Sequence, residues 1–240
     1  MTGSRPSAPA TQMDPRLLSR PDAILFDMDG VLADVSGSYR RVIVEVCAAF
    51  GVAIAPGAVV AAKVAGDAND DYKVTEQLLL RAGVDVDTDD VQRRFDALYW
   101  GSGQRPGLRS NEHLIADRSM LERLAGEYEL AIVTGRPRAD AEAFLSEQRI
   151  SHLFKALAAR EDAPSKPSPA PVTLVLRTLG TRSAWLLGDT PDDMRAARAA
   201  GAVPVGVIAP GDDQILMRSA LVDSGALTVL DSINEIGGLL

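Results

Sequence analysis

Two acids follow directly behind a short apolar run in the stretch Ala23-Ile24-Leu25-Phe26-Asp27-Met28-Asp29-Gly30. Four apolar residues that end abruptly in a polar loop are typical of a buried strand in a parallel sheet. The polar part, Asp-x-Asp-Gly, is by itself also common in turns. Its interpretation therefore depends on what the rest of the chain places beside it.

The alternation of a short apolar run with a longer helical stretch repeats along the chain. It is typical of an α/β domain with a parallel sheet, because helices cross over between parallel strands. The expected strands are residues 23–26, 130–133, 156–158, 184–187, 203–208 and 227–230. The expected helices of this part are residues 138–148, 171–179 and 192–200, with a short closing helix at 232–239.

One segment breaks the alternation. Residues 36–109 contain no apolar run of comparable strength, and their helical patterns lie at residues 38–50, 58–63, 71–82 and 89–99. We expect residues 101–107, which contain Gly and Pro, to be the linker that returns to the core. The expected organisation is a flexible tail at residues 1–20, an α/β core formed by residues 21–35 and 110–240, and an all-helical subdomain at residues 36–109.

The composition limits the classes of function. The chain has 240 residues, and 25 Lys and Arg stand against 33 Asp and Glu, which gives a net charge of −8. Proteins that bind nucleic acids usually concentrate positive charge, so we expect no nucleic-acid partner. The single cysteine, Cys47, excludes an intrachain disulfide. No apolar run approaches the roughly 20 residues that span a membrane, so we expect no membrane partner and a cytoplasmic location.

Polar side chains follow the strong strands at the point where each strand ends. The carboxyl ends of parallel strands meet at one edge of the sheet, where α/β proteins bind ligands, so these side chains should converge there. Lys166 could join them from the loop after the third strand. The candidate residues of this edge are Asp27, Asp29, Thr134, Gly135, Arg136, Lys166, Asp189 and Asp193.

Four acids in one small cleft favour a bound cation. Carboxylates that lie close together repel one another strongly, and without a counter-ion some must stay protonated. Mg²⁺ resolves this conflict, since it prefers a few carboxylates, several waters and a substrate phosphate. Lys166 adds a fixed positive charge, Thr134 adds a hydroxyl, and Gly135 lets the backbone approach an anion. A carboxylate nucleophile with a metal, a lysine and a hydroxyl is the set that phosphoryl transfer requires.

Four stretches resemble the motifs of the haloacid-dehalogenase-like (HAD) hydrolase superfamily, and they occur in the family's order. They are Ile24-Leu25-Phe26-Asp27-Met28-Asp29-Gly30-Val31-Leu32, Ile132-Val133-Thr134-Gly135-Arg136, Lys166-Pro167 and Leu187-Gly188-Asp189-Thr190-Pro191-Asp192-Asp193. The resemblance covers the chain from Pro21 onward. It is to subfamily I, which carries a helical C1-type cap and includes enzymes like phosphoglycolate phosphatase and β-phosphoglucomutase. It implies a Rossmann-like parallel sheet with the helical subdomain as the cap.

The resemblance also implies a role for each motif residue. Asp27 would be the nucleophile that forms an aspartyl-phosphate. Asp29 would give a proton to the leaving alcohol and later take one from the attacking water. Thr134 and Lys166 would hold the transferred phosphoryl group. The implied Mg²⁺ ligands are Asp27, Asp189, the backbone carbonyl of Asp29 and, through a bound water, Asp193, which is favoured over its neighbour Asp192.

An acid at position 29 discriminates among the reactions of the superfamily. Relatives that cleave carbon–halogen bonds usually lack it, and so do phosphonate-cleaving relatives, which use a cap lysine to form a Schiff base. Lys63 lies in the cap, but Asp29 argues against that chemistry. Phosphoester hydrolysis fits best, and a phosphomutase of the β-phosphoglucomutase type stays open because it would keep both acids. A non-catalytic binding or regulatory protein on this fold is the alternative from another class.

The cap segment from Lys63 to Tyr72 resembles, in its position, the loop with which the family recognises substrates. Its polar residues could equally cap the helix that begins near residue 71. The expected substrate-binding residues are Gly135, Arg136, Lys63, Asn69 and Asp70. If an acid of this segment lines the pocket, the substrate could carry an amine, as an amino-alcohol phosphate such as histidinol phosphate does. The sequence thus predicts a Mg²⁺-dependent phosphomonoester hydrolase for a small phosphorylated metabolite.

Overall fold

Parallel strands form one central sheet. The computed structural model describes residues 19–55, 57–66, 70–103 and 105–240, so the predicted tail lies outside it as far as residue 18. The strands are β1 (Ala23–Phe26), β6 (Glu129–Val133), β7 (Phe154–Ala158), β8 (Ala184–Gly188), β9 (Val203–Val207) and β10 (Thr228–Leu230). Within the described residues they form a six-stranded sheet in the order β10-β9-β8-β1-β6-β7, and every pairing is parallel. The predicted α/β class and all six predicted strands are confirmed.

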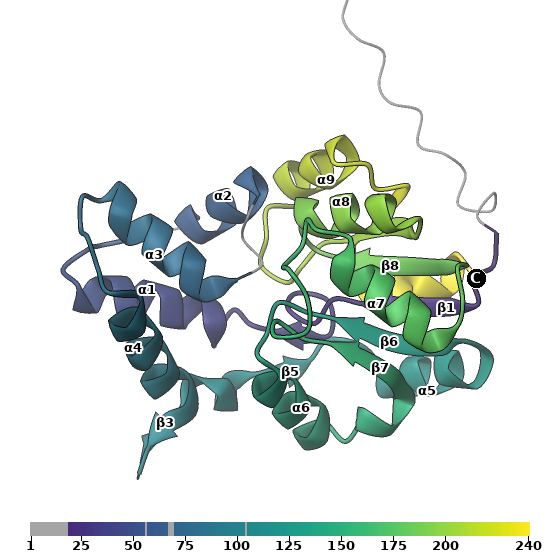
Figure 1. The fold of residues 1–240 in the computed structure, drawn as a ribbon, viewed down its shortest axis with the longest axis horizontal. Coiled ribbons are helices and arrows are strands. Elements are labelled where there is room, and N and C mark those ends of the chain that lie inside the picture. The colour runs from purple at the N-terminus through teal and green to yellow at the C-terminus, as the bar shows by residue number, and fades with distance from the viewer. Residues whose placement is uncertain (1–18, 56, 67–69, 104) are drawn as a thin grey trace, which may run out of the picture.

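Helices cover both faces of this sheet. They are α5 (Arg118–Glu127), α6 (Arg138–Glu147), α7 (Ala170–Leu179), α8 (Pro191–Ala200) and α9 (Gln214–Asp223), followed by the short η4 (Ile233–Gly238). Figure 1 shows α7 and α8 on one side of the sheet and α5 and α6 on the other. Among the described residues, no helix has both the length and the apolar character that crossing a membrane requires.

The side chains of β1 alternate between two apolar layers. Ile24 and Phe26 pack in the layer that α5 and α6 cover, and Ala23 and Leu25 pack in the layer under α7 and α8. A strand that is buried on both faces has apolar residues at every position. This is why the sequence of β1 shows a continuous apolar run with an abrupt end.

Four further helices form a group beside the sheet, and we call them the cap. They are α1 (Tyr39–Ala49), α2 (Ala58–Ala65), α3 (Asp71–Arg81) and α4 (Thr88–Trp100). α1 packs against both α3 and α4, and Figure 1 shows the cap at the left of the sheet and its helices. The residue limits of the two parts, 36–109 for the helical part, stay a prediction.

The two connections between the cap and the core run side by side. β2 (Ala33–Asp34) leaves the core and pairs antiparallel with β5 (His113–Leu114), by which the chain returns. Residues 101–107, predicted as a linker, contain a secondary structure of their own. Here β3 (Gly101–Ser102) pairs antiparallel with β4 (Arg105–Pro106).

Two core helices, α5 and α9, were not predicted. α5 buries Met120, Leu121 and Leu124, which are spaced as on one face of a helix. α9 begins after Asp213, whose side chain accepts a hydrogen bond from the N–H of Leu216, as an N-cap residue does. Both signals are present in the sequence.

The end of β8 and the start of α8 approach each other closely at Gly188. A β-carbon on Gly188 would lie 2.2 Å from the Cβ of Asp193. Only a residue without a side chain fits there. Gly188 thereby lets α8 bring Asp193 against the end of the strand.

Replacing Gly188 with alanine should therefore destabilise the protein. Overpacking of this kind costs about 1–3 kcal/mol of the free energy of unfolding. The matched control is Gly126→Ala in α5, where a β-carbon would meet nothing within 4 Å. That substitution should instead stabilise the fold by roughly 0.5–1 kcal/mol, because glycine disfavours a helix. Urea unfolding measures both changes, and an unchanged midpoint in Gly188→Ala would contradict the close approach.

Candidate active site

Three buried carboxylates lie together at the carboxyl edge of the sheet. Asp27 follows β1, Asp189 follows β8, and Asp193 lies in the first turn of α8. One oxygen of each carboxylate lies within 4.8 Å of the others. β1 and β8 are neighbours, with Phe26 paired to Leu187, so the residues that follow these two come to lie side by side. The structure thus brings together three of the acids predicted as metal ligands.

A capping box at the start of α8 orients Asp193. The hydroxyl and the backbone N–H of Thr190 both donate to Asp193 Oδ2, at 2.5 Å and 3.0 Å, and Asp193 N–H donates to Thr190 Oγ1 at 3.3 Å. The neighbouring Asp192 instead forms an ion pair with Arg195 at 3.0 Å. The role of Thr190 was missed from the sequence, although Thr and Asp three residues apart are the signature of a capping box.

Lys166 lies between two of the carboxylates. Its Nζ donates to Asp27 Oδ1 at 2.9 Å, to Asp193 Oδ1 at 2.5 Å and to the carbonyl oxygen of Val133 at 3.2 Å. Burial disfavours the charge of Lys166, but the two carboxylates outweigh this effect and raise its pKa above the ordinary value. Lys166 is therefore a buried ammonium ion.

The carboxylates carry more negative charge than Lys166 balances. Burial raises the pKa of Asp27 well above its ordinary value, and neighbouring acids add to the rise against the opposite effect of Lys166. Burial raises the pKa of Asp189 to about 6, although Lys63 lowers it. Among the described residues, Asp189 Oδ1 has no hydrogen-bond partner. A hard cation would bind this oxygen and reduce the repulsion, so the donor set fits Mg²⁺.

Gly30 allows the loop after β1 to pass close to Asp189. Its φ is +77°, and a β-carbon on it would lie 2.3 Å from Asp189 Oδ2. Both the backbone conformation and the close approach require glycine at this position. The turn-like glycine of the first motif therefore belongs to the site.

Two cap residues, Lys63 and Asp71, line the same cavity as the carboxylates of the core. Lys63 Nζ lies 3.4 Å from Asp189 Oδ2. Burial works against the charge of Lys63, but Asp189 and other acids raise its pKa, so it is also an ammonium ion. Burial raises the pKa of Asp71, the first residue of α3, to about 7 against the lowering effect of Lys63. Together with Asp27 and Asp29, these residues line a cavity of about 20 Å³.

Thr134, Gly135 and Arg136 follow β6, next to β1. Gly135 lines the cavity, and Thr134 Oγ1 accepts a hydrogen bond from the N–H of Arg136 at 3.1 Å. The guanidinium of Arg136 donates to Asp29 Oδ1 at 2.6 Å and to Glu112 Oε2 at 2.9 Å. Arg136, predicted to bind substrate, thus lies buried against protein carboxylates.

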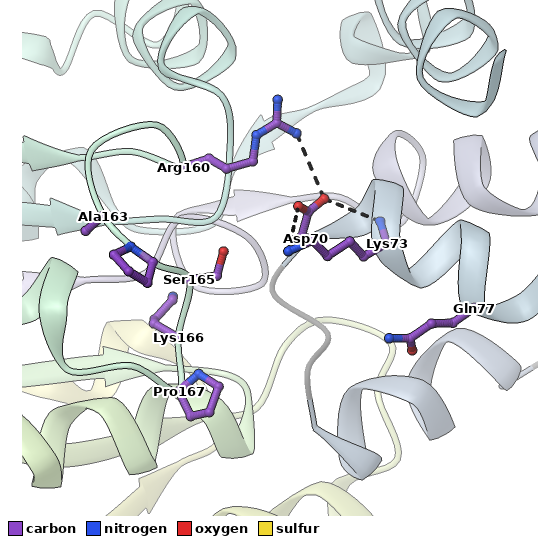
Figure 2. Close-up of a pocket in the computed structure, with 9 residues that line it drawn as sticks. Asp70, Lys73, Gln77, Arg160, Ala163, Ser165, Lys166 and Pro167 are labelled. Atoms are coloured by element: carbon purple, nitrogen blue, oxygen red, sulfur yellow. Dashed lines mark hydrogen bonds and ion pairs between the residues drawn. The ribbon is translucent and has the colours of Figure 1, made fainter. Parts of the chain in front are cut away.

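A larger cleft opens between α3 and the loop after β7. It has a volume of about 530 Å³ and is lined by Asp70, Lys73, Gln77, Arg160, Ala163, Pro164, Ser165, Lys166 and Pro167, as Figure 2 shows. Asp70 lies in this cleft and also caps α3, because its side chain accepts from the N–H groups of Tyr72 and Lys73. Its oxygens lie 3.9 Å from both Lys73 Nζ and Arg160 Nη1. The other predicted cap contact, Asn69, lies outside the described residues.

Two sequence relatives are similar over most of this chain. A Phytophthora nicotianae protein named imidazoleglycerol-phosphate dehydratase is 41% identical over 196 residues, which are 78% of this chain and 43% of that protein. This chain therefore spans less than half the length of that relative. A plasmid phosphoglycolate phosphatase of Cupriavidus necator is 32% identical over 216 residues, which are 84% of this chain and 89% of that protein.

Solved structures share the fold, and a family pattern covers most of the chain. A hydrolase from Pseudomonas syringae superposes with a TM-score of 0.71 at 20% identity, over 91% of this chain and 97% of the other. The family described as haloacid dehalogenase-like hydrolase matches residues 24–207, which run from β1 to β9 and include all four motifs. The chain therefore belongs to the haloacid dehalogenase-like hydrolase family.

Proposed function

We propose that this protein is a Mg²⁺-dependent phosphomonoester hydrolase that acts on a small phosphorylated metabolite through an aspartyl-phosphate on Asp27. The observation that carries the proposal is the position of Lys166, whose ammonium contacts both Asp27 and Asp193. A carboxylate can attack a negatively charged phosphate only where cations neutralise both groups. The family description and the relative named phosphoglycolate phosphatase support the same class of reaction.

The metal would be held by the carboxylates at the end of the sheet. The proposed ligands are Asp27, Asp189, Asp193 and the backbone carbonyl of Asp29. When bound, Mg²⁺ would neutralise the charge of the carboxylates and of the phosphate and so allow them to approach.

The proposed reaction has two halves. In the first, Asp27 attacks phosphorus, the bond from phosphorus to the leaving oxygen breaks, and Asp29 gives that oxygen a proton. In the second, Asp29 takes a proton from a water that attacks the same phosphorus, which releases inorganic phosphate and restores Asp27. Thr134 and Lys166 hold the phosphoryl oxygens throughout.

The leaving group is proposed to carry an amine. Asp71 lines the carboxylate cavity from the cap. Burial raises its pKa to about 7 even with Lys63 in the same cavity, so a further cation beside it would favour its charged form. An amino-alcohol phosphate such as histidinol phosphate would supply that cation. Lys63 would contact the phosphate, since its ammonium ion attracts an anion. It would not form a Schiff base, because that reaction requires an amine without its extra proton. Gly135 and Asp70 are proposed as further substrate contacts.

Replacing Asp27 with asparagine should abolish hydrolysis, because an amide cannot form the phosphorylated intermediate. The assay follows phosphate release from a phosphate ester with Mg²⁺ present. The control is Asp85→Asn, at an exposed position, which should keep the wild-type rate. Full activity in Asp27→Asn would refute the mechanism, and isomerised substrate without phosphate release would identify a phosphomutase.

Removing the metal should have two separate effects. EDTA should abolish hydrolysis, and added Mg²⁺ should restore it. Independently of activity, Mg²⁺ should raise the Tm, since a ligand at 100 times its Kd adds about 2.7 kcal/mol of stability. Asp189→Asn should lose most of this Tm shift while Asp85→Asn keeps it. An equal shift in Asp189→Asn would locate the ion at other residues.

A panel of esters tests the amine. The assay compares kcat/KM for histidinol phosphate, imidazoleglycerol phosphate, phosphoglycolate and glucose 6-phosphate. Imidazoleglycerol phosphate is included because of the name of the Phytophthora relative. A charged hydrogen bond contributes about 1.5–3 kcal/mol, so the amine-bearing ester should be preferred by roughly 10- to 100-fold. Asp71→Asn should remove that preference and leave the sugar phosphate rate unchanged. A wild-type preference for the sugar phosphate would exclude the amine hypothesis.

A further inference from the structure

Arg136 lies at the centre of the contact between the core and the cap. Its Nε donates to Asp29 Oδ1 at 2.6 Å. Its Nη1 donates to Glu112 Oε2 at 2.9 Å and to the hydroxyl oxygen of Tyr99 at 3.2 Å. The side chain is 0% exposed, so these protein groups, and not water, surround its charge.

Aromatic rings from the cap and the core hold the guanidinium. Its carbon lies 4.8 Å from the ring centroid of Tyr39 in α1 and 5.3 Å from that of Phe144 in α6. The hydroxyl of Tyr39 donates to Asp140 of α6 at 2.5 Å, and its ring centroid lies 4.5 Å from that of Tyr99 in α4. The first and the last helix of the cap therefore meet at one buried cation of the core.

This arrangement makes the orientation of Asp29 depend on the position of the cap. The side chain of Asp29 lines the cavity and is 18% exposed, whereas those of Asp27 and Asp189 are 6% and 1% exposed. Arg136 binds one of its oxygens. A shift of α1 and α4 would move the Tyr39 ring and the Tyr99 hydroxyl, and with them the guanidinium that holds Asp29.

We propose that Arg136 is a positioning residue, which aims the carboxyl of Asp29 at the leaving oxygen when Tyr39 and Tyr99 of the cap close upon it. This role rests on the proposed function, because it requires Asp29 to exchange protons during hydrolysis. It replaces the direct substrate contact predicted for Arg136 from the sequence.

A purely structural role for Arg136 is the alternative. A buried guanidinium between two carboxylates and two rings also joins the cap to the core, and its removal leaves buried charges without a partner. Such a role would lower the rate with every substrate alike. The test must therefore follow the proton transfer itself.

The experiment compares the first turnover of two phosphate esters. Nitrophenolate is a stable leaving group that needs no proton, whereas an alkoxide must receive one. In the first half of the reaction, the proton from Asp29 therefore matters only for the alkyl ester. The reference is Asp29→Asn. It should release about one nitrophenolate per protein in a burst and then turn over slowly, because the water is no longer activated. With an alkyl phosphate its first turnover should already be slow.

Substitutions along the proposed chain of contacts should reproduce this pattern. Arg136→Met should keep the full nitrophenolate burst and slow the first alkyl turnover by about 10²–10³-fold. Tyr99→Phe should do the same by roughly tenfold, the size of one hydrogen bond to a charged group. Arg136→Lys should recover part of the alkyl rate. The double variant Arg136→Met/Tyr99→Phe should be no slower than Arg136→Met, because the hydroxyl acts through the arginine.

The control is Arg123→Met, at an exposed position of α5, which should match the wild type with both esters. Equal slowing of both esters in Tyr99→Phe and Arg136→Lys would overturn the positioning role. These two variants keep a buried cation at position 136, so they decide the question even if Arg136→Met fails to fold. Turnover in Asp27→Asn would refute the proposed function itself. If Asp27→Asn is inactive but Tyr99→Phe and Arg136→Lys slow both esters equally, only the role of Arg136 is refuted.

Discussion

The ammonium of Lys166 allows the acids at the end of the sheet to lie as close together as they do. Two like charges 4 Å apart repel by about 4 kcal/mol at the effective dielectric of a protein surface, and here three carboxylates have oxygens within 4.8 Å of one another. Lys166 contacts two of them, and Lys63 contacts the third. Two glycines and a capping box then supply the space and the orientation that this crowding requires.

The part of the fold that repeats locally could be predicted from the sequence. β1 is apolar on both faces, so its limits are visible without any knowledge of its neighbours. The acids of the site come directly after strands, and the parallel order brings Asp27 and Asp189 together wherever the helices lie. Thr190 was equally readable, because its capping box is a spacing of three residues.

The other site residues depend on how the cap lies on the core, which no local pattern encodes. Glu112 and Tyr99 belong to segments without a motif, and their contacts with Arg136 appear only in the folded structure. Asp71 reads as the start of a helix, and its burial beside Lys63 appears only in three dimensions. For the same reason a direct substrate contact was a fair expectation for Arg136 from the sequence, since an arginine that is fully buried is rare.

The pairing of β2 with β5 has a consequence for the history of such a chain. The cap leaves the core and returns to it at one point, so its four helices amount to a loop whose ends are already held together. Because the free energy of closing a loop rises slowly with its length, helices could be added, removed or exchanged there without shifting any strand of the main sheet. The sheet can therefore stay unchanged while the cap varies, except at Tyr39 and Tyr99, whose contacts with Arg136 tie α1 and α4 to the carboxylates of the core.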